Sequence, residues 1–314
     1  MRTTPTPMFF VSVAFKGLRN CGSPLFATHR RQDYLLHKSR KRRYPPIVSD
    51  WIRGRTVTIA AGFHVEDGFL FCSDTEGATE SLRLFKRKVL SPTVGDCKYM
   101  YTGAGDSDFI SMAAQKIEQE LHAHLVSTFE EFATVVEDVI VKIHERNIAA
   151  FPDDAKPSFS MIFGVLLNGK MQLIRTNATS VIMSSHYECV GSGSVLGRFI
   201  LDKLYCPTSE IVHVSIAAIY MLQQARKYSP GCGGHSHIFC LREDGTWGIV
   251  SSKEIEAWET FFGHAEGVGR SFITAYNRSY IAGTFQKSVR NVLKEAQHLP
   301  KPFSEFRWID ETAY

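Results

Sequence analysis

The stretch RTVTIAAGFHVEDGFLFCSD, residues 55–74, decides the predicted fold. β-branched and apolar residues fill TVTIAAGF (56–63), EDG (66–68) is a turn signal, and FLFCSD (69–74) is typical of a buried strand. The pattern predicts an antiparallel hairpin that ends in Asp74. Thr56 and Thr58 stand at its start, two residues apart and therefore on one face. They could be ordinary strand threonines, or one could be a nucleophile that is released when the preceding chain is cut away.

The 55 residues before Thr56 differ in composition from the rest of the chain. They contain 12 Lys and Arg and 2 acidic residues, net +10, which leaves 24 basic and 30 acidic residues, net −6, for the remainder. This leader could be an Arg-rich targeting peptide, a propeptide or a solvated arm, and we expect it to be poorly ordered. Its run KSRKRR (38–43) could contact nucleic acid, but a lone basic run indicates little by itself, and we expect no nucleic-acid partner.

The composition of the whole chain is that of a globular protein with one large or two small domains. Of its 314 residues, 44% are hydrophobic and 22% are charged. No stretch approaches the ~20 apolar residues of a membrane helix, so we expect no membrane partner. The seven cysteines are scattered, which favours reduced thiols in a cytoplasmic protein. CGGHSH (232–237) has no second ligand pair to accompany it, so we expect neither a metal site nor a cofactor.

Strands and helices follow the hairpin in blocks. Short strands are predicted in KRKVLSP (86–92) and KYMYTGAG (98–105), followed by helices over 106–125 and 129–151. Two or three strands come next, including 159–167 and 170–177 around the turn NGK, and then helices over 195–205 and 209–228. A hairpin over 235–252 and a mixed helical tail over 254–297 complete the order. Blocks argue against a Rossmann-type parallel sheet. They predict an α+β fold, a four-layer αββα sandwich of two antiparallel sheets with a helix pair on each outer face.

The block order and four local sequences resemble the β-type proteasome subunits, a family of N-terminal-nucleophile (Ntn) hydrolases. The sequences are TIAAGFHVEDGFLFCSD (58–74), KVL (88–90) with TGAGDSDF (102–109), CVGSGSVLGRFILD (189–202) and GGHSHIFCLREDG (233–245). The resemblance runs from about Thr56 to Val250. It divides the chain into a leader (1–55), an Ntn-hydrolase domain (56–252) and a helical C-terminal extension (253–314).

The resemblance implies a threonine nucleophile whose own α-amine is the base. A free α-amine titrates near ~8 and reaches its own hydroxyl, so the preceding peptide bond must be cleaved. A lysine lowers the proton affinity of the amine, an aspartate holds that lysine, and backbone N–H groups of a glycine-rich turn receive the oxyanion. The matching positions are Thr58 as nucleophile with Thr56 as the alternative, Asp74, Lys88 with Lys86 as fallback, Ser192 beside the amine, and Gly103 and Gly105 at the oxyanion turn.

The sequence departs from the family pattern at three positions. Ser229 and Cys232 stand where the family has an aspartate and a serine, and Val57 stands where self-processing members have a glycine before the nucleophile. Ordinary structural roles remain alternatives for the site residues. Asp74 could cap a turn, Lys88 could be a solvated strand residue, and Ser192 could serve the start of a helix.

Three functions are consistent with these observations. The first is a proteasome-like threonine endopeptidase that cleaves polypeptides in a ring chamber, provided that the chain is processed at Thr58 or Thr56. The second is a catalytically inactive ring or scaffold subunit, and the third is a related amidase that acts on a small amide. We expect a homo-oligomer or a mixed ring with related subunits, with polypeptides as substrates if the chain is active.

Overall fold

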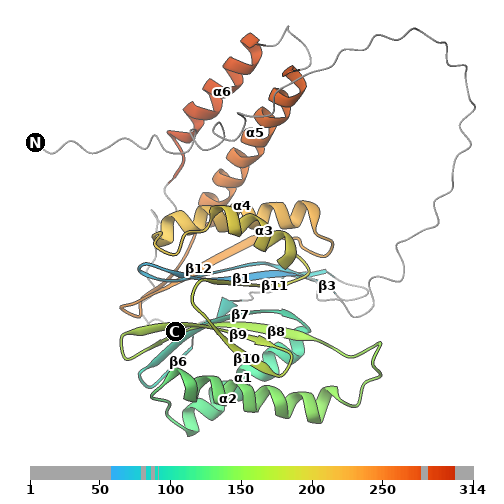
Figure 1. Ribbon diagram of the computed structural model, residues 1–314, viewed down its shortest axis with the longest axis vertical. Helices are drawn as coiled ribbons and strands as arrows, with labels where there is room; N and C mark the ends of the chain where they lie inside the picture. The colour runs from blue at the N-terminus through green and yellow to red at the C-terminus, as the bar shows by residue number, and fades with distance from the viewer. Residues whose placement is uncertain (1–57, 79–82, 86–88, 91, 277–281, 301–314) are drawn as a thin grey trace, which may run out of the picture. The chain divides into compact units, whose positions relative to one another are not determined.

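The computed structural model describes residues 58–78, 83–85, 89–90, 92–276 and 282–300, all of them within one unit, Val48–Tyr314. Two sheets lie face to face, and helices cover the outer face of each (Figure 1). The predicted αββα sandwich of antiparallel sheets is therefore confirmed. The leader, Thr56, Lys86 and Lys88 lie outside the described residues.

The first sheet contains the opening hairpin. Its strands, in spatial order, are β11 (Tyr187–Gly191), β1 (Ile59–Val65), β2 (Gly68–Asp74), β12 (Ser236–Arg242) and β13 (Trp247–Ile249). β1 pairs with β2 from Ala60 opposite Ser73 to Val65 opposite Gly68, as the sequence predicts. Gly68 has a φ of 154°, and a Cβ there would lie 2.3 Å from the carbonyl oxygen of Leu241, so the turn requires glycine.

The second sheet faces the first. Its strands, in spatial order, are β10 (Ser180–Ser184), β9 (Lys170–Asn177), β8 (Phe159–Leu167), β7 (Cys97–Gly105) and β5 (Val89–Leu90), and β6 (Thr93–Val94) also pairs with β7. β8 and β9 have the predicted bounds. Asn168 and Gly169, with φ of 53° and 69°, form the predicted tight turn between them. A separate ribbon of β3 (Glu76–Ala78) and β4 (Arg83–Phe85) follows β2.

Two helices cover the outer face of the second sheet. α1 (Ser107–Ala123) begins at the predicted acid, because the side chain of Asp106 accepts from two backbone N–H groups of the first turn. α2 (Phe129–Ile143) begins with a capping box formed by Thr128 and Glu131. Their buried faces share one apolar core with β7 and β8.

The prediction of one helix over 129–151 is wrong at its end. α2 gives way at Ile143 to a π-helical turn, η2 (His144–Ile148), in which the Ala149 N–H reaches the carbonyl of His144 at 2.8 Å. The turn places His144 against the ring of Phe159 on β8, with ring centroids 5.9 Å apart. The widened turn therefore joins the helix layer to the sheet.

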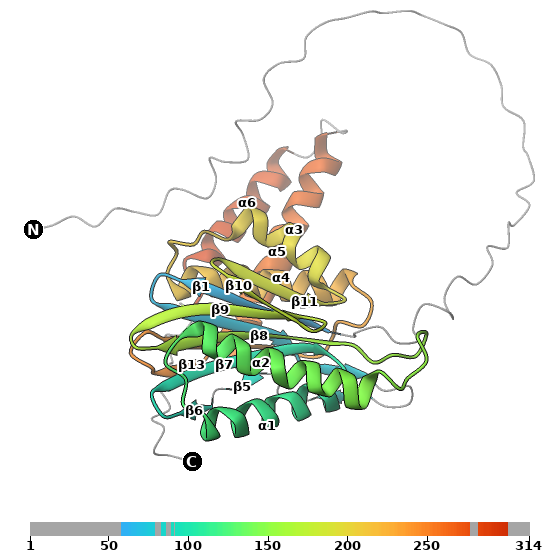
Figure 2. The ribbon, with the colours of Figure 1, turned by 60° about the horizontal axis from the view of Figure 1, so that its bottom comes forward.

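The other helices lie beyond the first sheet. α3 (Ser194–Leu204) and α4 (Ile211–Tyr228) cover it, and α5 (Ser252–Tyr276) and α6 (Ala282–Ala296) follow as a helical hairpin (Figures 1 and 2). Ile255, Trp258 and Phe262 of α5 pack on the core formed by α4 and this sheet. Within the described ranges, the helices are too short or too polar to cross a membrane.

Candidate active site

Four neighbouring strands of the first sheet have their ends close together, at one end of the sheet. β1 begins and β2 ends there, since Ala60 pairs with Ser73. β11 ends there with Gly191 opposite Ile59. β12 begins there with Ser236 opposite Asp74. Antiparallel pairing therefore collects Thr58, Asp74 and the loops after β11 and before β12 in one place.

Asp74, the last residue of β2, is buried at this end of the sheet and contacts the neighbouring segments. Its Oδ1 accepts a hydrogen bond from the Thr58 hydroxyl and lies 3.4 Å from the Ile59 nitrogen. Its Oδ2 accepts from the Gly233 N–H at 3.0 Å. The carboxylate is 0% exposed and Thr58 is 2% exposed. These donors compensate for the burial of the Asp74 side chain and fix the orientation of the Thr58 hydroxyl.

Ser192 connects Thr58 with the loop that follows α4. Its hydroxyl accepts from the Thr58 backbone nitrogen at 3.4 Å. The same oxygen lies 3.3 Å from the carbonyl of Thr58 and 3.1 Å from the carbonyl of Pro230, to which it can donate its single proton. The Sγ of Cys232 is 3.8 Å away. The structure therefore brings Thr58, Asp74 and Ser192 together, and an α-amine at Thr58 would lie beside Ser192.

Glycines around Ser192 allow the close approach of Thr58. Gly191 has a φ of 96°, and a Cβ there would lie 2.2 Å from the Thr58 carbonyl oxygen and 3.0 Å from the Cβ of Ala104. The Gly193 N–H donates to the same carbonyl at 3.3 Å. In the sequence GSGS, Gly191 thus leaves room for the Thr58 carbonyl and Gly193 donates a hydrogen bond to it.

Gly103 and Gly105 lie in the last part of β7, which pairs with β8. A Cβ on Gly105, whose φ is 120°, would lie 2.2 Å from the Ser158 carbonyl oxygen, and one on Gly103 would lie 2.9 Å from that of Ser160. Close approach of the neighbouring backbone accounts for both glycines. Ala104, between them, is the residue that faces Gly191.

The remaining predicted positions divide into two groups. Thr56, Lys86 and Lys88 lie outside the described residues; Val89, which follows Lys88 in sequence, pairs with Thr102 of β7. Of the three departures from the family pattern, Ser229 and Cys232 are described and Val57 is not. Ser229 is the C-cap of α4 and offers a hydroxyl where the family has a carboxylate, and Cys232 is buried beside Ser192.

Three site residues were missed by the sequence analysis in their roles. Gly191 lets the Thr58 carbonyl approach, Gly233 donates to Asp74, and Pro230 receives Ser192. The signal for the first two is a glycine at the end of one strand and a Gly-Gly pair shortly before another, since both mark close approach of backbones. Pro230 acts through its carbonyl, for which the residue type gives no signal.

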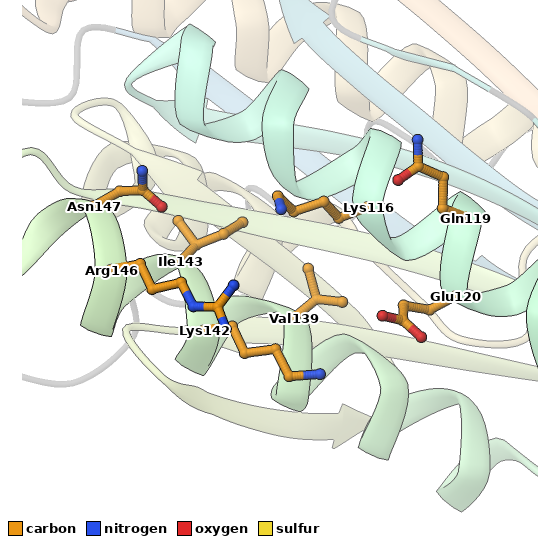
Figure 3. A pocket seen from close by; sticks show the side chains of 8 residues that line it. All are labelled: Lys116, Gln119, Glu120, Val139, Lys142, Ile143, Arg146 and Asn147. Atoms are coloured by element: carbon orange, nitrogen blue, oxygen red, sulfur yellow. The ribbon is translucent and has the colours of Figure 1, made fainter.

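A hollow of about 220 Å³ lies between α1 and α2, away from Thr58 (Figure 3). Its lining is mostly polar: Lys116, Gln119, Glu120, Val139, Lys142, Ile143, Arg146 and Asn147. It opens on the helix layer of the second sheet, whereas Thr58 belongs to the first sheet, so it is not part of the candidate active site. In the described part of the chain, His, Cys, Asp and Glu side chains do not gather in a group of three that could hold a metal ion.

Comparisons with known proteins find similarity at the level of structure. No family model matches the chain, and no curated protein matches it. Anbu from Hyphomicrobium sp. strain MC1 superposes with a TM-score of 0.58 at 15% identity, over 68% of this chain and 97% of that one. Anbu (ancestral beta-subunit) from Yersinia bercovieri gives 0.58 at 13% identity, over 70% and 97%. The helical assembly of the Anbu complex from Pseudomonas aeruginosa gives 0.53 at 14% identity, over 79% and 99%.

These comparisons correct the family suggested by the sequence. The assignment to the β-type proteasome subunits is wrong, because neither family models nor curated proteins support it and the structural matches are Anbu proteins, a related but distinct family. At identities of 13–15% the likeness is one of fold. The chain has the αββα fold that Anbu, the ancestral beta-subunit, also has.

Proposed function

We propose that this protein is a proteasome-related, threonine-type peptidase whose nucleophile is Thr58, released by cleavage of the Val57–Thr58 bond. The observation that carries the proposal is the arrangement around Thr58. Its hydroxyl is held by the carboxylate of Asp74, and its backbone nitrogen lies 3.4 Å from the hydroxyl of Ser192. The fold shared with Anbu supports the same class of protein.

The uncut chain lacks the base that this chemistry needs. The nitrogen of Thr58 belongs to a peptide bond, so it cannot take a proton, and Thr58 is only 2% exposed. Cleavage before Thr58 converts the amide into an α-amine with a pKa near ~8. Processing therefore supplies the base, and it also removes the chain attached to the buried nucleophile.

The proposed reaction then proceeds in two steps. The Thr58 hydroxyl gives its proton to the α-amine, Oγ1 bonds to the substrate carbonyl carbon, and the carbon–nitrogen bond breaks as the departing amine takes that proton. Water then attacks the ester, releases the carboxylic acid and returns a proton to Oγ1. We propose that Lys88, or Lys86 in its place, lowers the proton affinity of the α-amine. We also propose that Gly103 and Gly105 form the turn whose backbone N–H groups bind the oxyanion.

The second candidate is a non-catalytic subunit of an assembly. Two observations favour it: Ser229 offers no carboxylate near the amine position, and Cys232 replaces the serine beside Ser192. In both cases we propose a cytoplasmic protein that assembles with its own copies or with related subunits. The Anbu complex from Pseudomonas aeruginosa, which has a similar fold, forms a helical assembly. A monomeric mass by light scattering at micromolar concentration, 35.4 kDa for the uncut chain and less for the cut chain, would contradict the assembly.

Activity measurements on Thr58 variants test the catalytic proposal. Hydrolysis of a mixture of fluorogenic peptide amides should be lost in Thr58→Ala and kept in part in Thr58→Ser, because serine supplies the same hydroxyl and amine. Thr134→Ala, on the exposed face of α2, is the control and should retain wild-type activity. Equal activity of Thr58→Ala and wild type would exclude Thr58 as the nucleophile, and an inactive wild type that remains uncut would favour the non-catalytic subunit.

A further inference from the structure

A cluster of polar contacts joins α4 to α5 close to the candidate active site. Arg226, in the last turn of α4, donates from Nη2 to the carboxylate of Glu259 on α5. From Nη1 it donates to the Ser236 hydroxyl at 2.8 Å and lies 3.3 Å from the Gly234 carbonyl oxygen. The Ser236 hydroxyl donates in turn to Glu259 at 3.0 Å. The side chains of Arg226 and Glu259 are 15% and 22% exposed, so the pair is less screened than a surface ion pair.

Both further partners of Arg226 lie in residues 229–236, the segment that carries the contacts to Asp74. Ser236 stands opposite Asp74 in the pairing of β12 with β2. Gly233, next to Gly234, donates its N–H to Oδ2 of Asp74. The guanidinium therefore binds the segment at Gly234, one residue from the N–H group that contacts the carboxylate, and at Ser236, the residue opposite Asp74 in the sheet.

The same segment is tied to the site at two more points. The His235 N–H donates to the Thr75 hydroxyl at 2.8 Å, and the Thr75 N–H donates to the His235 carbonyl at 3.0 Å. At the other end of the segment, the Pro230 carbonyl receives the Ser192 hydroxyl. A shift of the segment would disturb the partners of Asp74 and Ser192 together.

We infer that Arg226 and Glu259 are positioning residues: through them, α5 holds residues 229–236 in the place where their backbone meets Asp74 and Ser192. Neither side chain contacts Thr58, so their effect passes through the segment. The α5 helix lies outside the two sheets, and this contact makes it part of the support of the site. The catalytic consequence rests on the proposed function, whereas the positioning of the segment can be measured by itself.

The interface of α4 with α5 supplies a matched control. Glu266 lies two helical turns beyond Glu259 on α5 and accepts from Lys227 of α4 at 2.7 Å and from Gln224. It joins the same two helices but makes no contact with residues 229–236 among those described. Glu266→Gln therefore weakens the docking of α5 to a similar degree without touching the segment.

Hydrogen–deuterium exchange of the full-length protein tests the inference. Arg226→Met and the milder Glu259→Gln should raise the exchange rate of the Gly233 and His235 amides about tenfold, because loss of a hydrogen bond to a charged group loosens the segment. Glu266→Gln should leave both rates as in wild type. Unchanged rates in Arg226→Met, or an equal rise in Glu266→Gln, would overturn the inference.

Kinetics separates this inference from the proposed function. In an active protein, Arg226→Met should lower kcat about tenfold with little change in KM, and Arg226→Lys should recover part of the loss, because lysine can still reach one acceptor. A wild-type protein that does not hydrolyse peptides, combined with faster exchange in Arg226→Met, would contradict the proposed function and support the positioning role. Normal kcat in Arg226→Met would exclude the catalytic consequence.

Discussion

At the scale of single residues, the site depends on how Asp74 is satisfied. The carboxylate is fully buried and accepts from the Thr58 hydroxyl and the Gly233 N–H, with the Ile59 N–H 3.4 Å from Oδ1. Donors approach both oxygens, so both oxygens must be acceptors. An aspartate side chain supplies two acceptor oxygens, whereas asparagine supplies one.

The exchange Asp74→Asn tests this requirement. One oxygen becomes an NH₂ group that faces a buried donor, and the free energy of unfolding should fall by about 1–3 kcal/mol. Urea denaturation measures the change. The control Asp153→Asn, at a residue whose side chain is 95% exposed, should stay within about 0.5 kcal/mol of wild type. A wild-type stability of Asp74→Asn would show that the two contacts contribute nothing.

Gly191 gives a second test at this scale. Gly191→Ala places a Cβ 2.2 Å from the Thr58 carbonyl oxygen at a φ of 96° and should destabilise the protein by about 1–3 kcal/mol while it displaces Thr58. Gly263→Ala, in α5, is the matched control: an added Cβ meets nothing within 4 Å, so alanine should stabilise by about 0.5–1 kcal/mol. Thermal unfolding should show opposite signs, and equal signs would refute the account of Gly191.

At the scale of elements, the sequence predicts those strands, helices and turns that have a clear hydrophobic period or characteristic turn residues. The hairpin of β1 and β2, the β8–β9 pair and the order of blocks follow from alternation, EDG and NGK, and they are confirmed. The edge strand β10 was not located, because its side chains are mostly exposed and show no buried face. β11 was also not located, yet it ends at Gly191 and thereby places Ser192 beside Thr58. Such contacts arise from pairing between distant segments, which no local pattern contains.

The π-helical turn after α2 carries a prediction about pH. Burial lowers the pKa of His144 below its usual 6.5, and its Nε2 has no hydrogen-bond partner among the described residues. The folded state therefore binds this proton less readily than the unfolded state. His144 stabilises the fold fully above about pH 6.5, and this contribution is lost as the pH falls below that value.

The variant His144→Phe isolates this contribution. The ring stacked on Phe159 is kept and the titratable group is removed, so the unfolding free energy should fall less between pH 7 and pH 5 than in wild type. His64, whose pKa burial also lowers, supplies a remaining slope in both proteins. Urea denaturation at pH 7, 6 and 5 gives the comparison, and parallel pH profiles of the two proteins would contradict the assignment.

At the scale of the whole molecule, three parts of the chain have separate proposed roles. We propose residues 1–55 as a leader that is removed together with Thr56 and Val57, 56–252 as the domain that carries Thr58, and 253–314 as an extension whose first helix supports the site through Glu259. The leader is strongly basic and the remainder is acidic, which is consistent with removal of the leader and retention of the remainder. The fold shared with Anbu covers about two thirds of the chain or more. Thr58 is central to this account, because its proposed chemistry requires it to be the N-terminal residue, whereas 57 residues precede it in the sequence.

The N-terminal residue of the mature protein tests this claim most directly. Intact-mass measurement of the protein purified from its native cells, with Edman sequencing of the same sample, should show a chain that begins at Thr58. Thr58→Ala should remain uncut if the hydroxyl of Thr58 performs the cleavage. A wild-type chain in which the Val57–Thr58 bond is intact, or one that begins at Thr56, would contradict the assignment of Thr58 as the N-terminal nucleophile.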